Sequence, residues 1–383
     1  MLILLDCRPL QLAGPDSEKN RLIVAAIAAL SGDKAVEWLL VVDHTCRPDG
    51  LPRLPDGHFL TDLPGSRLLT ARGLPGPLGW KLWYDWQLPR FVKRYLPDVV
   101  MLTGGVTAKA AAARQYLWMP VYANPKETAA GITMSASAVV PIYAARLGTS
   151  MRQADTIFCF SENDRTWLAG RQHIDAGKIL VVRPSPSPDV HPMTVSDKEA
   201  IKQRHTGGKE YFFAGAAGAG EEDVVQLLKA FSLFKRRQLS NLQLVMAGIP
   251  TESLRQRQET YKFRGDVHWI GDDAGDLMAA AYAVLFPFED GSLGSSLMNA
   301  WKARVPALVA RSSRLREMAD EAALVAGTDD PTALAGYMMS VYKDETLRNA
   351  LIEKGTSRLA VLDPAASLVA IRTAIDREIN KIK

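Results

Sequence analysis

Two glycine-rich turns in the second half of the chain have residue types that suit phosphate binding. The first contains Gly215, Gly218 and Gly220, and it lies between the apolar run at 211–214 and a long helical pattern. Backbone N–H groups at the start of such a helix can receive a phosphate. An ordinary strand-to-helix turn is the alternative. The two glutamates that follow the turn favour that alternative, because their carboxylates would repel an anion.

The second turn is GSLGSS at residues 291–296, between the apolar run AVLFPF and a further helical pattern. Gly291 and Gly294 would let a ligand approach the backbone closely. Ser295 and Ser296 are candidates for the N-cap of the helix that follows. Exposed N–H groups and the helix dipole at this point suit a phosphate. An ordinary capped helix is the alternative.

An alternation of short apolar runs and helical stretches would position these turns. The expected strands lie at residues 2–5, 36–42, 99–103, 120–123, 156–160 and 179–182, and then at 211–214, 242–247, 267–270, 284–287, 307–310 and 322–325. Strands interleaved with helices predict parallel sheets with helices on both faces. A proline- and serine-rich stretch at 183–192 interrupts the alternation and is typical of a linker. The sequence therefore predicts two α/β domains.

Length and composition agree with a two-domain globular protein. The chain has 383 residues, of which 47% are hydrophobic and 23% are charged. A formal charge of +4 is small for this length and gives no reason to expect nucleic-acid binding. The six histidines are scattered without metal-ligand spacing, so no metal site is expected.

A tryptophan-rich stretch at 79–97 admits two interpretations. Trp80, Trp83 and Trp86 form an aromatic stripe with basic residues at its end. Core packing against the N-terminal sheet is one interpretation, and a helix lying on a membrane is the other. The opening MLILLD is too short for a signal peptide, and no run of about 18 apolar residues exists for a membrane span. We expect a cytoplasmic protein, with peripheral contact at the inner membrane as the alternative.

The order of segments over most of residues 150–360 resembles the retaining glycosyltransferases of family GT4, also called glycosyl transferases group 1. TIFCFSENDRTWL is similar to the family's strand that ends in a Ser-Glu pair before a helix. YFFAGAAGAGEEDVVQLLKAFSLF is similar to its glycine turn and the helix after it. LQLVMAGIP, VHWIGDDAGDLMAAAYAVLFPFEDGSLGSSLMNAWKARVPALVA and DDPTALAGYMMSVYKDETLRNALIEKG follow in the family's order.

The resemblance implies the GT-B architecture, in which two Rossmann-like domains face a cleft. The N-terminal acceptor-side domain would span residues 1–185 and include a C-terminal helix at 362–383. The nucleotide-sugar-binding domain would span residues 186–361. The implied reaction moves a hexose from a nucleotide diphosphate sugar to a saccharide or lipid-linked acceptor, with retention and without a metal or cofactor. Many members of the family act in polysaccharide synthesis.

The resemblance also assigns site residues. The catalytic candidates are Asn124, Glu289 and Asp290. Of the two adjacent carboxylates, which would point opposite ways in a strand, one would contact a sugar hydroxyl or hold a cation, and a solvated loop is the alternative. The donor-binding candidates are the residues of the two turns and of the helix after the second turn: Gly215, Gly218, Gly220, Gly291, Gly294, Ser295, Ser296, Asn299 and Arg304.

Several positions depart from the family pattern. Glu222, with Glu221 beside it, aligns with the lysine that usually neutralises the donor diphosphate. Asn299 aligns with the glutamate that usually holds the ribose, and Asn124 aligns with a histidine. Arg304 aligns with a small residue. The missing positive charge would come from cations near the following strand, or those cations are surface residues only: Lys302, Arg304, Arg311 and Arg314.

These departures keep other functions open. A non-catalytic GT-B protein that acts as a binding or scaffolding module is the main alternative to a glycosyltransferase. A sugar-nucleotide epimerase is a third candidate. It would need acid and base groups in the cleft that the sequence does not identify.

Overall fold

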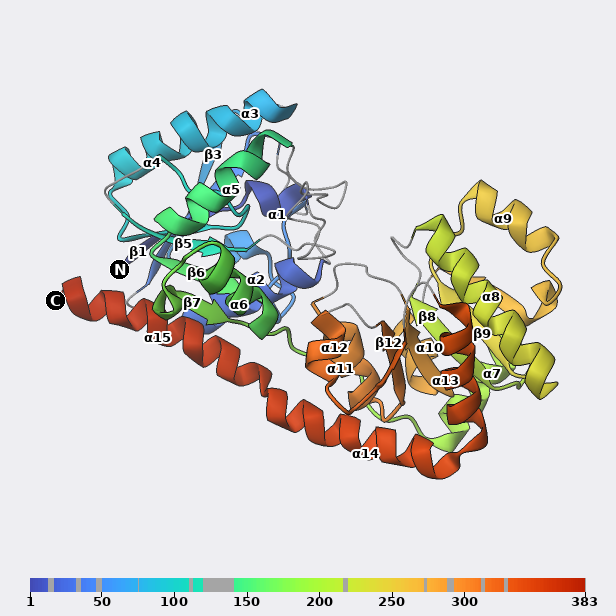
Figure 1. Cartoon of the computed structure of the whole chain (residues 1–383). Helices are drawn as coiled ribbons and strands as arrows, with labels where there is room; N and C mark the ends of the chain where they lie inside the picture. The colour runs from blue at the N-terminus through green and yellow to red at the C-terminus, as the bar shows by residue number, and fades with distance from the viewer. Residues whose placement is uncertain are drawn as a thin grey trace. The chain divides into compact units, whose positions relative to one another are not determined.

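The computed structural model describes residues 1–12, 17–31, 36–45, 50–74, 76–109, 113–119, 141–215, 220–271, 274–287, 293–310, 314–326 and 330–382. The chain divides into two compact units (Figure 1). Unit 1 comprises Met1–Pro184 and Pro364–Lys383, and unit 2 comprises Ser185–Asp363. Each unit contains one parallel sheet with helices, so the predicted α/β class is confirmed. The acceptor and donor roles expected of the two parts stay predictions.

Unit 1 is built on a seven-stranded sheet in the order β3-β2-β1-β4-β5-β6-β7. Every strand pair in it is parallel. The strands are β1 (Leu2–Asp6), β2 (Glu37–Asp43), β3 (Ser66–Ala71), β4 (Val99–Leu102), β5 (Arg114–Trp118), β6 (Thr156–Cys159) and β7 (Ile179–Val181). The sequence did not predict β3 or β5. Most of β3 is exposed or half-buried at the sheet edge, so its sequence has no apolar run. The strand expected at 120–123 lies outside the described residues.

The helices of unit 1 include one from the far end of the chain. They are α1 (Arg8–Leu12), α2 (Glu18–Ser31), α3 (Gly76–Leu82), a π-helix (Trp83–Gln87), α4 (Leu88–Tyr95), α5 (Pro141–Gln153), α6 (Glu162–Arg171) and α15 (Pro364–Ile382). The Tyr116 hydroxyl donates to the Ala374 carbonyl at 3.0 Å. Ile371 and Ile375 of α15 are fully buried. The last helix therefore packs as part of unit 1.

The tryptophan-rich stretch runs from α3 through the π-helix into α4. Trp80 and Trp83 are buried, which confirms core packing for these two side chains. Trp86 is exposed and lies under the Arg90 guanidinium, 3.6 Å from the ring centroid. None of the helices in the described parts of the chain is long and apolar enough to span a bilayer.

Unit 2 is built on a six-stranded sheet in the order β10-β9-β8-β11-β12-β13, again with parallel pairs only. Its strands are β8 (Tyr211–Gly215), β9 (Gln243–Ala247), β10 (Val267–Ile270), β11 (Ala283–Phe286), β12 (Ala307–Ala310) and β13 (Leu324–Ala326). Its helices are α7 (Val195–Thr206), α8 (Glu221–Gln238), α9 (Glu252–Glu259), α10 (Ala274–Ala280), α11 (Ser295–Lys302), α12 (Arg314–Ala319), α13 (Pro331–Lys343) and α14 (Glu345–Leu362).

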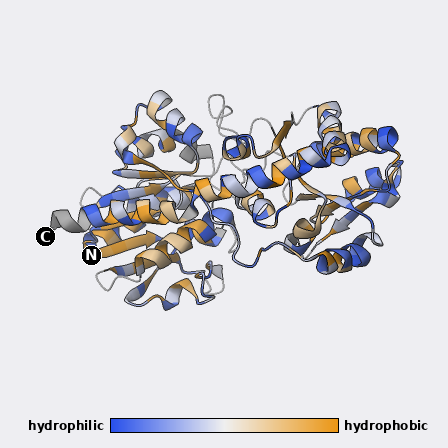
Figure 2. Ribbon diagram, turned by 90° about the horizontal axis from the view of Figure 1, so that it is seen from below, coloured by the Kyte–Doolittle hydropathy of each residue, from blue (hydrophilic) through white to orange (hydrophobic). Residues whose placement is uncertain are grey.

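Burial on both faces explains why the strands read as nearly continuous apolar runs. Figure 2 shows the strands of both units largely in the hydrophobic colour. In unit 2, α8 and α13 pack together over one face of the sheet. Phe212 of β8 meets Phe234 of α8 edge to face, with ring centroids 5.2 Å apart. The helix face that carries Phe234 also buries Leu227 and Phe231.

Candidate functional site

Each sheet has one place where the strand order reverses. In unit 1, β1 pairs with both β2 and β4, and in unit 2, β8 pairs with both β9 and β11. Connections that leave two such strands go to opposite sides, so a crevice opens at their carboxyl ends. Ligands of open α/β sheets bind in that crevice. The topology thus gives two candidate positions, one in each unit.

Both predicted turns lie at the reversal point of unit 2. Gly215 ends β8, and Gly220 is the N-cap of α8. Both glycines are exposed. Gly294 precedes α11, which follows the neighbouring strand β11. Because β8 and β11 are adjacent and parallel, their carboxyl ends lie at the same edge of the sheet. The predicted residues Asn124, Gly218, Glu289, Asp290 and Gly291 lie outside the described residues.

The start of α11 differs from the prediction. The N-cap is Gly294, with φ +102°, so the prediction of a serine N-cap is wrong. Ser295 is buried and Ser296 is exposed, and both lie in the first helical turn. A Cβ atom on Gly294 would lie 2.5 Å from the Met318 sulfur. The positive φ therefore favours glycine here whether or not a ligand approaches, and any Cβ would also force the Met318 side chain to shift.

Asn299 and Lys302 hold the first residues of unit 2. The Asn299 side-chain oxygen accepts a hydrogen bond from the Ser187 N–H at 2.7 Å. The Lys302 amine donates to the carbonyl oxygens of Ser187 and Pro188 at 2.8 and 3.1 Å. These contacts give both side chains a structural role, and they direct the Lys302 charge to the backbone rather than to a donor diphosphate.

The arginines near β12 are placed differently from one another. Arg304 follows α11 with φ +59°, is exposed and forms an ion pair with Glu353 of α14. Arg314 is buried in the first turn of α12. Arg311 lies outside the described residues. Replacement of the missing donor-site charge by these groups stays a prediction.

The first turn of α8 carries the acidic residues Glu221, Glu222 and Asp223. The Thr251 hydroxyl donates to Glu221 at 2.6 Å, and this bond lowers the pKa of the Glu221 carboxyl. Glu222 accepts a hydrogen bond from Gln226 at 2.7 Å. Carboxylates at a helix N-terminus also interact favourably with the helix dipole. Helix stability thus accounts for these residues without a ligand.

The reversal point of unit 1 contains a buried carboxyl that no motif in the sequence indicates. Asp6 ends β1 and is fully buried. It accepts hydrogen bonds from the Trp83 indole at 3.0 Å and from the Tyr84 hydroxyl at 2.9 Å. Burial raises the pKa of Asp6 to about 6, although the bonds from Tyr84 and Trp83 oppose the shift.

A lysine lies close to this carboxyl. The Lys19 amine donates to the Thr103 carbonyl at 2.6 Å, and the Thr103 hydroxyl donates to the Asp6 carbonyl at 2.7 Å. Desolvation of the amine lowers the pKa of Lys19 to about 7, and the Asp6 charge opposes this shift. The unit therefore brings together two groups that titrate near neutral pH at the place where its topology predicts a ligand. Nothing in the spacing of residues 6 and 19 indicates this arrangement.

Arg8 supports the same region from the side of α1. Its Nε lies 3.3 Å from Asp43 at the end of β2, and another nitrogen donates to the Leu74 carbonyl at 2.7 Å. Its guanidinium also stacks 4.1 Å from the Trp80 ring centroid. These contacts make Arg8 a structural residue. Within the described ranges, no three His, Cys, Asp or Glu side chains gather as metal ligands.

Residues 195–358, nearly all of unit 2, match the family model of glycosyl transferases group 1. Unit 2 is therefore similar in sequence to glycosyl transferases group 1. The match includes both glycine turns and the strands β8 and β11 between which the reversal point lies. No curated protein matches the chain in sequence.

The chain as a whole is similar in fold to solved glycosyltransferases. A glycosyltransferase from Rickettsia africae has a TM-score of 0.71 at 12% identity, covering 100% of this chain and 98% of that one. Sucrose-phosphate synthase from Thermosynechococcus elongatus has a TM-score of 0.68 at 15% identity and full coverage of both chains. Anabaena HepE, solved with UDP-glucose, has a TM-score of 0.67 at 13% identity, covering 98% and 100%. The chain therefore has the GT-B fold.

Proposed function

We propose that the protein transfers a hexose from a nucleotide diphosphate sugar to a saccharide or lipid-linked acceptor, with retention at the anomeric carbon. The observation that carries this proposal is the family match of unit 2, which spans the reversal point and both of its turns. The structure of HepE with UDP-glucose, a protein of the same fold, supports a nucleotide sugar as the donor.

The donor would lie at the carboxyl ends of β8 and β11. Gly215 and Gly220 leave the backbone exposed on one side of this position, and the start of α11 adds a helix dipole on the other. Backbone amides would then bind the phosphates where the family uses basic side chains. Asn124, Glu289 and Asp290 remain our candidates for direct contact with the sugar. No resident cofactor or metal takes part in this scheme.

The acceptor would lie at the carboxyl ends of β1 and β4. Lys19 is suited to contact the acceptor hydroxyl, because an amine with a pKa of about 7 is partly neutral at neutral pH and can accept a proton. Both Asp6 oxygens already accept hydrogen bonds from Trp83 and Tyr84. Asp6 therefore acts as a positioning residue, whose charge sets how readily Lys19 holds its proton.

A non-catalytic binding or scaffolding protein is the second candidate. The acidic first turn of α8 favours it, because carboxylates near a diphosphate cost about 1 kcal/mol each even in high dielectric. The commitment of Lys302 to backbone carbonyls and of Arg304 to Glu353 favours it as well. Acidic residues in the turn and cations bound elsewhere in the protein both leave fewer positive charges to stabilise a leaving diphosphate.

A ligand screen separates the two candidates. We expect at least one nucleoside diphosphate or nucleotide sugar to raise the melting temperature of the full chain. At a ligand concentration of 100 times the dissociation constant, binding adds about 2.7 kcal/mol to the free energy of unfolding. NMR of the product sugar should then show the donor's anomeric configuration retained. Absence of both stabilisation and transfer across UDP-, GDP- and ADP-sugars would replace the enzyme proposal with the scaffold.

A further inference from the structure

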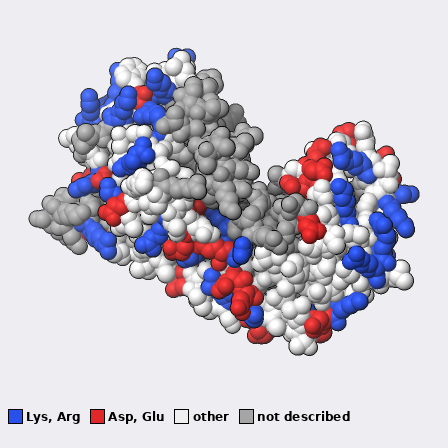
Figure 3. All heavy atoms as spheres, viewed as in Figure 1, with Lys and Arg blue, Asp and Glu red and all other residues white. Residues whose placement is uncertain are grey.

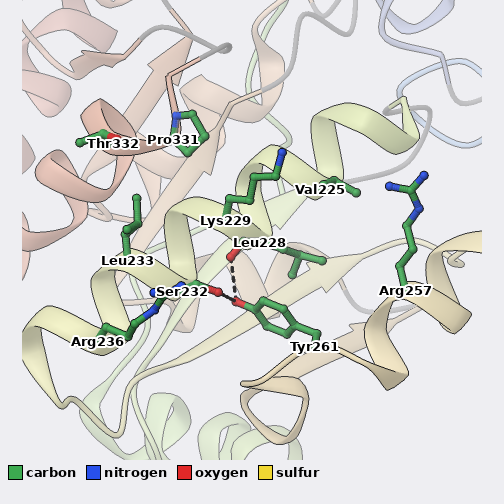
Figure 4. Close-up of a pocket in the computed structure, with 10 residues that line it drawn as sticks. All are labelled: Val225, Leu228, Lys229, Ser232, Leu233, Arg236, Arg257, Tyr261, Pro331 and Thr332. Atoms are coloured by element: carbon green, nitrogen blue, oxygen red, sulfur yellow. Dashed lines mark hydrogen bonds between the residues drawn. The ribbon is translucent and has the colours of Figure 1, made fainter.

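A cavity separate from the reversal point lies on unit 2, along the side of α8 that faces α9. It measures about 550 Å³. Three segments line it: α8, the end of α9 with the residues after it, and the start of α13 (Figure 4). Its lining residues are Val225, Leu228, Lys229, Ser232, Leu233, Arg236, Arg257, Tyr261, Pro331 and Thr332. None of them belongs to the turns at the reversal point.

The charge of this cavity is of one sign. Lys229, Arg236 and Arg257 line it, and no aspartate or glutamate does. Lys229 has one weak ion pair, 3.9 Å from Glu222. The Arg236 and Arg257 guanidiniums form no hydrogen bond or ion pair with another described residue, although the Arg257 charge helps to lower the pKa of Glu221. Figure 3 shows Lys and Arg side chains gathered over the part of unit 2 that carries α8 and α9. The cavity therefore offers two guanidiniums that no described ion pair neutralises.

The remainder of the lining is mainly apolar and includes the ring of Tyr261, whose hydroxyl is held by two hydrogen bonds. Val225, Leu228 and Leu233 contribute aliphatic surface beside the Tyr261 ring. The Tyr261 hydroxyl donates to the Leu228 carbonyl at 2.7 Å and accepts from the Ser232 hydroxyl at 2.8 Å. These two bonds hold the ring in place, and burial raises the pKa of Tyr261 to about 12, so the phenol stays neutral. An apolar surface with cations at its edge matches an amphiphilic anion.

The helix start at one end of the cavity is not the anion-binding group. The Asp330 carboxylate caps α13 by accepting from the Thr332 and Ala333 N–H groups at 2.9 and 3.0 Å. These amides are satisfied, and a carboxylate already occupies the helix dipole. Lys229 and Arg236 are seven residues apart on α8, which is about 10 Å along the helix axis and close to the same face. Their side chains, with that of Arg257, are the groups that can meet an anion.

We propose that this cavity binds a phosphorylated organic molecule, with the phosphate attracted by the charges of Lys229, Arg236 and Arg257 and an apolar portion resting on Leu228, Leu233 and Tyr261. The ligand is either a soluble phosphate ester or the head of an anionic phospholipid, because both present this chemistry. The site is separate from the proposed donor and acceptor positions and does not depend on glycosyl transfer.

The test compares two double variants of the full chain. Arg236→Gln with Arg257→Gln removes the two lining guanidiniums. Arg237→Gln with Arg255→Gln removes two exposed guanidiniums from the same helices that do not line the cavity. Phenyl phosphate and inorganic phosphate are titrated by calorimetry. Vesicles of phosphatidylcholine, with and without phosphatidic acid, are tested by co-sedimentation.

We expect phenyl phosphate or phosphatidic acid vesicles to bind the parent protein and the control variant equally, and the cavity variant at least about tenfold more weakly. Inorganic phosphate should bind more weakly than phenyl phosphate, because it lacks the apolar portion. Binding of phenyl phosphate without vesicle binding identifies a soluble ligand, and the reverse identifies a lipid headgroup. Equal loss in both double variants, or no binding of either probe to the parent protein, overturns the proposal.

Discussion

Burial changes what Asp6 and Lys19 do. In water their charges would be independent, but in unit 1 the carboxyl is fully buried and the amine donates to a backbone carbonyl beside it. The raised pKa of Asp6 and the lowered pKa of Lys19 bring both groups to within about a unit of neutral pH. A group that must exchange a proton during catalysis works best in that range.

The Lys19 amine should leave a pH signature in stability. Its folded-state pKa of about 7 lies below the ordinary value of 10.5, so the protonated amine destabilises the folded state. The full penalty applies below pH 7 and disappears as the pH rises towards 10.5. We expect Lys19→Met to raise the free energy of unfolding more at pH 6 than at pH 9, measured by urea titration. Exposed Lys81→Met is the control, and an equal effect of Lys19→Met at both pH values would contradict the prediction.

At the scale of elements, α8 connects the two candidate sites of unit 2. Its first turn lies at the reversal point and is acidic, while Lys229 in its middle and Arg236 in its last turn line the cavity. The acidic residues complement the helix dipole at the N-terminus, and Lys235, Arg236 and Arg237 complement it at the C-terminus. A negative charge at position 222 thus stabilises the helix, whereas a positive charge there would favour phosphate binding.

Glu222→Lys tests that conflict. The change removes a favourable charge from the first turn, so we expect a loss of about 0.5–1 kcal/mol in the free energy of unfolding. If a donor diphosphate lies at the start of α8, its affinity should rise roughly tenfold, because repulsion becomes attraction. Calorimetry with UDP gives the affinity and urea titration the stability.

The control for this change is Glu345→Lys, which makes the same charge reversal in the first turn of α14. Equal tightening in both variants would show an effect of net charge alone. An unchanged UDP affinity in the Glu222→Lys variant would place the diphosphate away from α8.

At the scale of the whole molecule, the chain crosses between the units twice. The first crossing follows Pro184 and the second follows Asp363, after which α15 completes unit 1. Arg183 and Ser367 meet at the edge of that unit, where the Arg183 N–H donates to the Ser367 hydroxyl at 2.8 Å. The polar stretch after residue 195 is not an open linker, because α7 occupies Val195–Thr206.

Limited proteolysis near the first crossing should show that the second crossing still holds the two units together. We expect subtilisin to cut first within 188–194, where most residues are exposed. The fragments should still elute together in gel filtration, because the downstream fragment carries α15, which is packed on unit 1. They should separate in denaturant. Ile371→Asp, which charges a fully buried position of α15, should release them without denaturant. Separation of the unmodified fragments in native buffer would contradict this account.

The sequence by itself determined the alternation of strands and helices and the position of the two glycine turns of unit 2. Those features are local, because an apolar run or a helical period is written in consecutive residues. The sequence did not indicate β3, because this edge strand is too exposed to form an apolar run.

Only the tertiary structure decided what the polar residues do. Asp6 and Trp83 are 77 positions apart, and Asn299 and Ser187 are 112 apart, yet each pair is joined by a hydrogen bond. Desolvation, which sets the pKa values of Asp6 and Lys19, depends on every element packed around them. Arg257 likewise lines the cavity beside Lys229 and Arg236 only because α9 folds back beside α8. Such contacts join segments distant in the chain, so no local pattern records them.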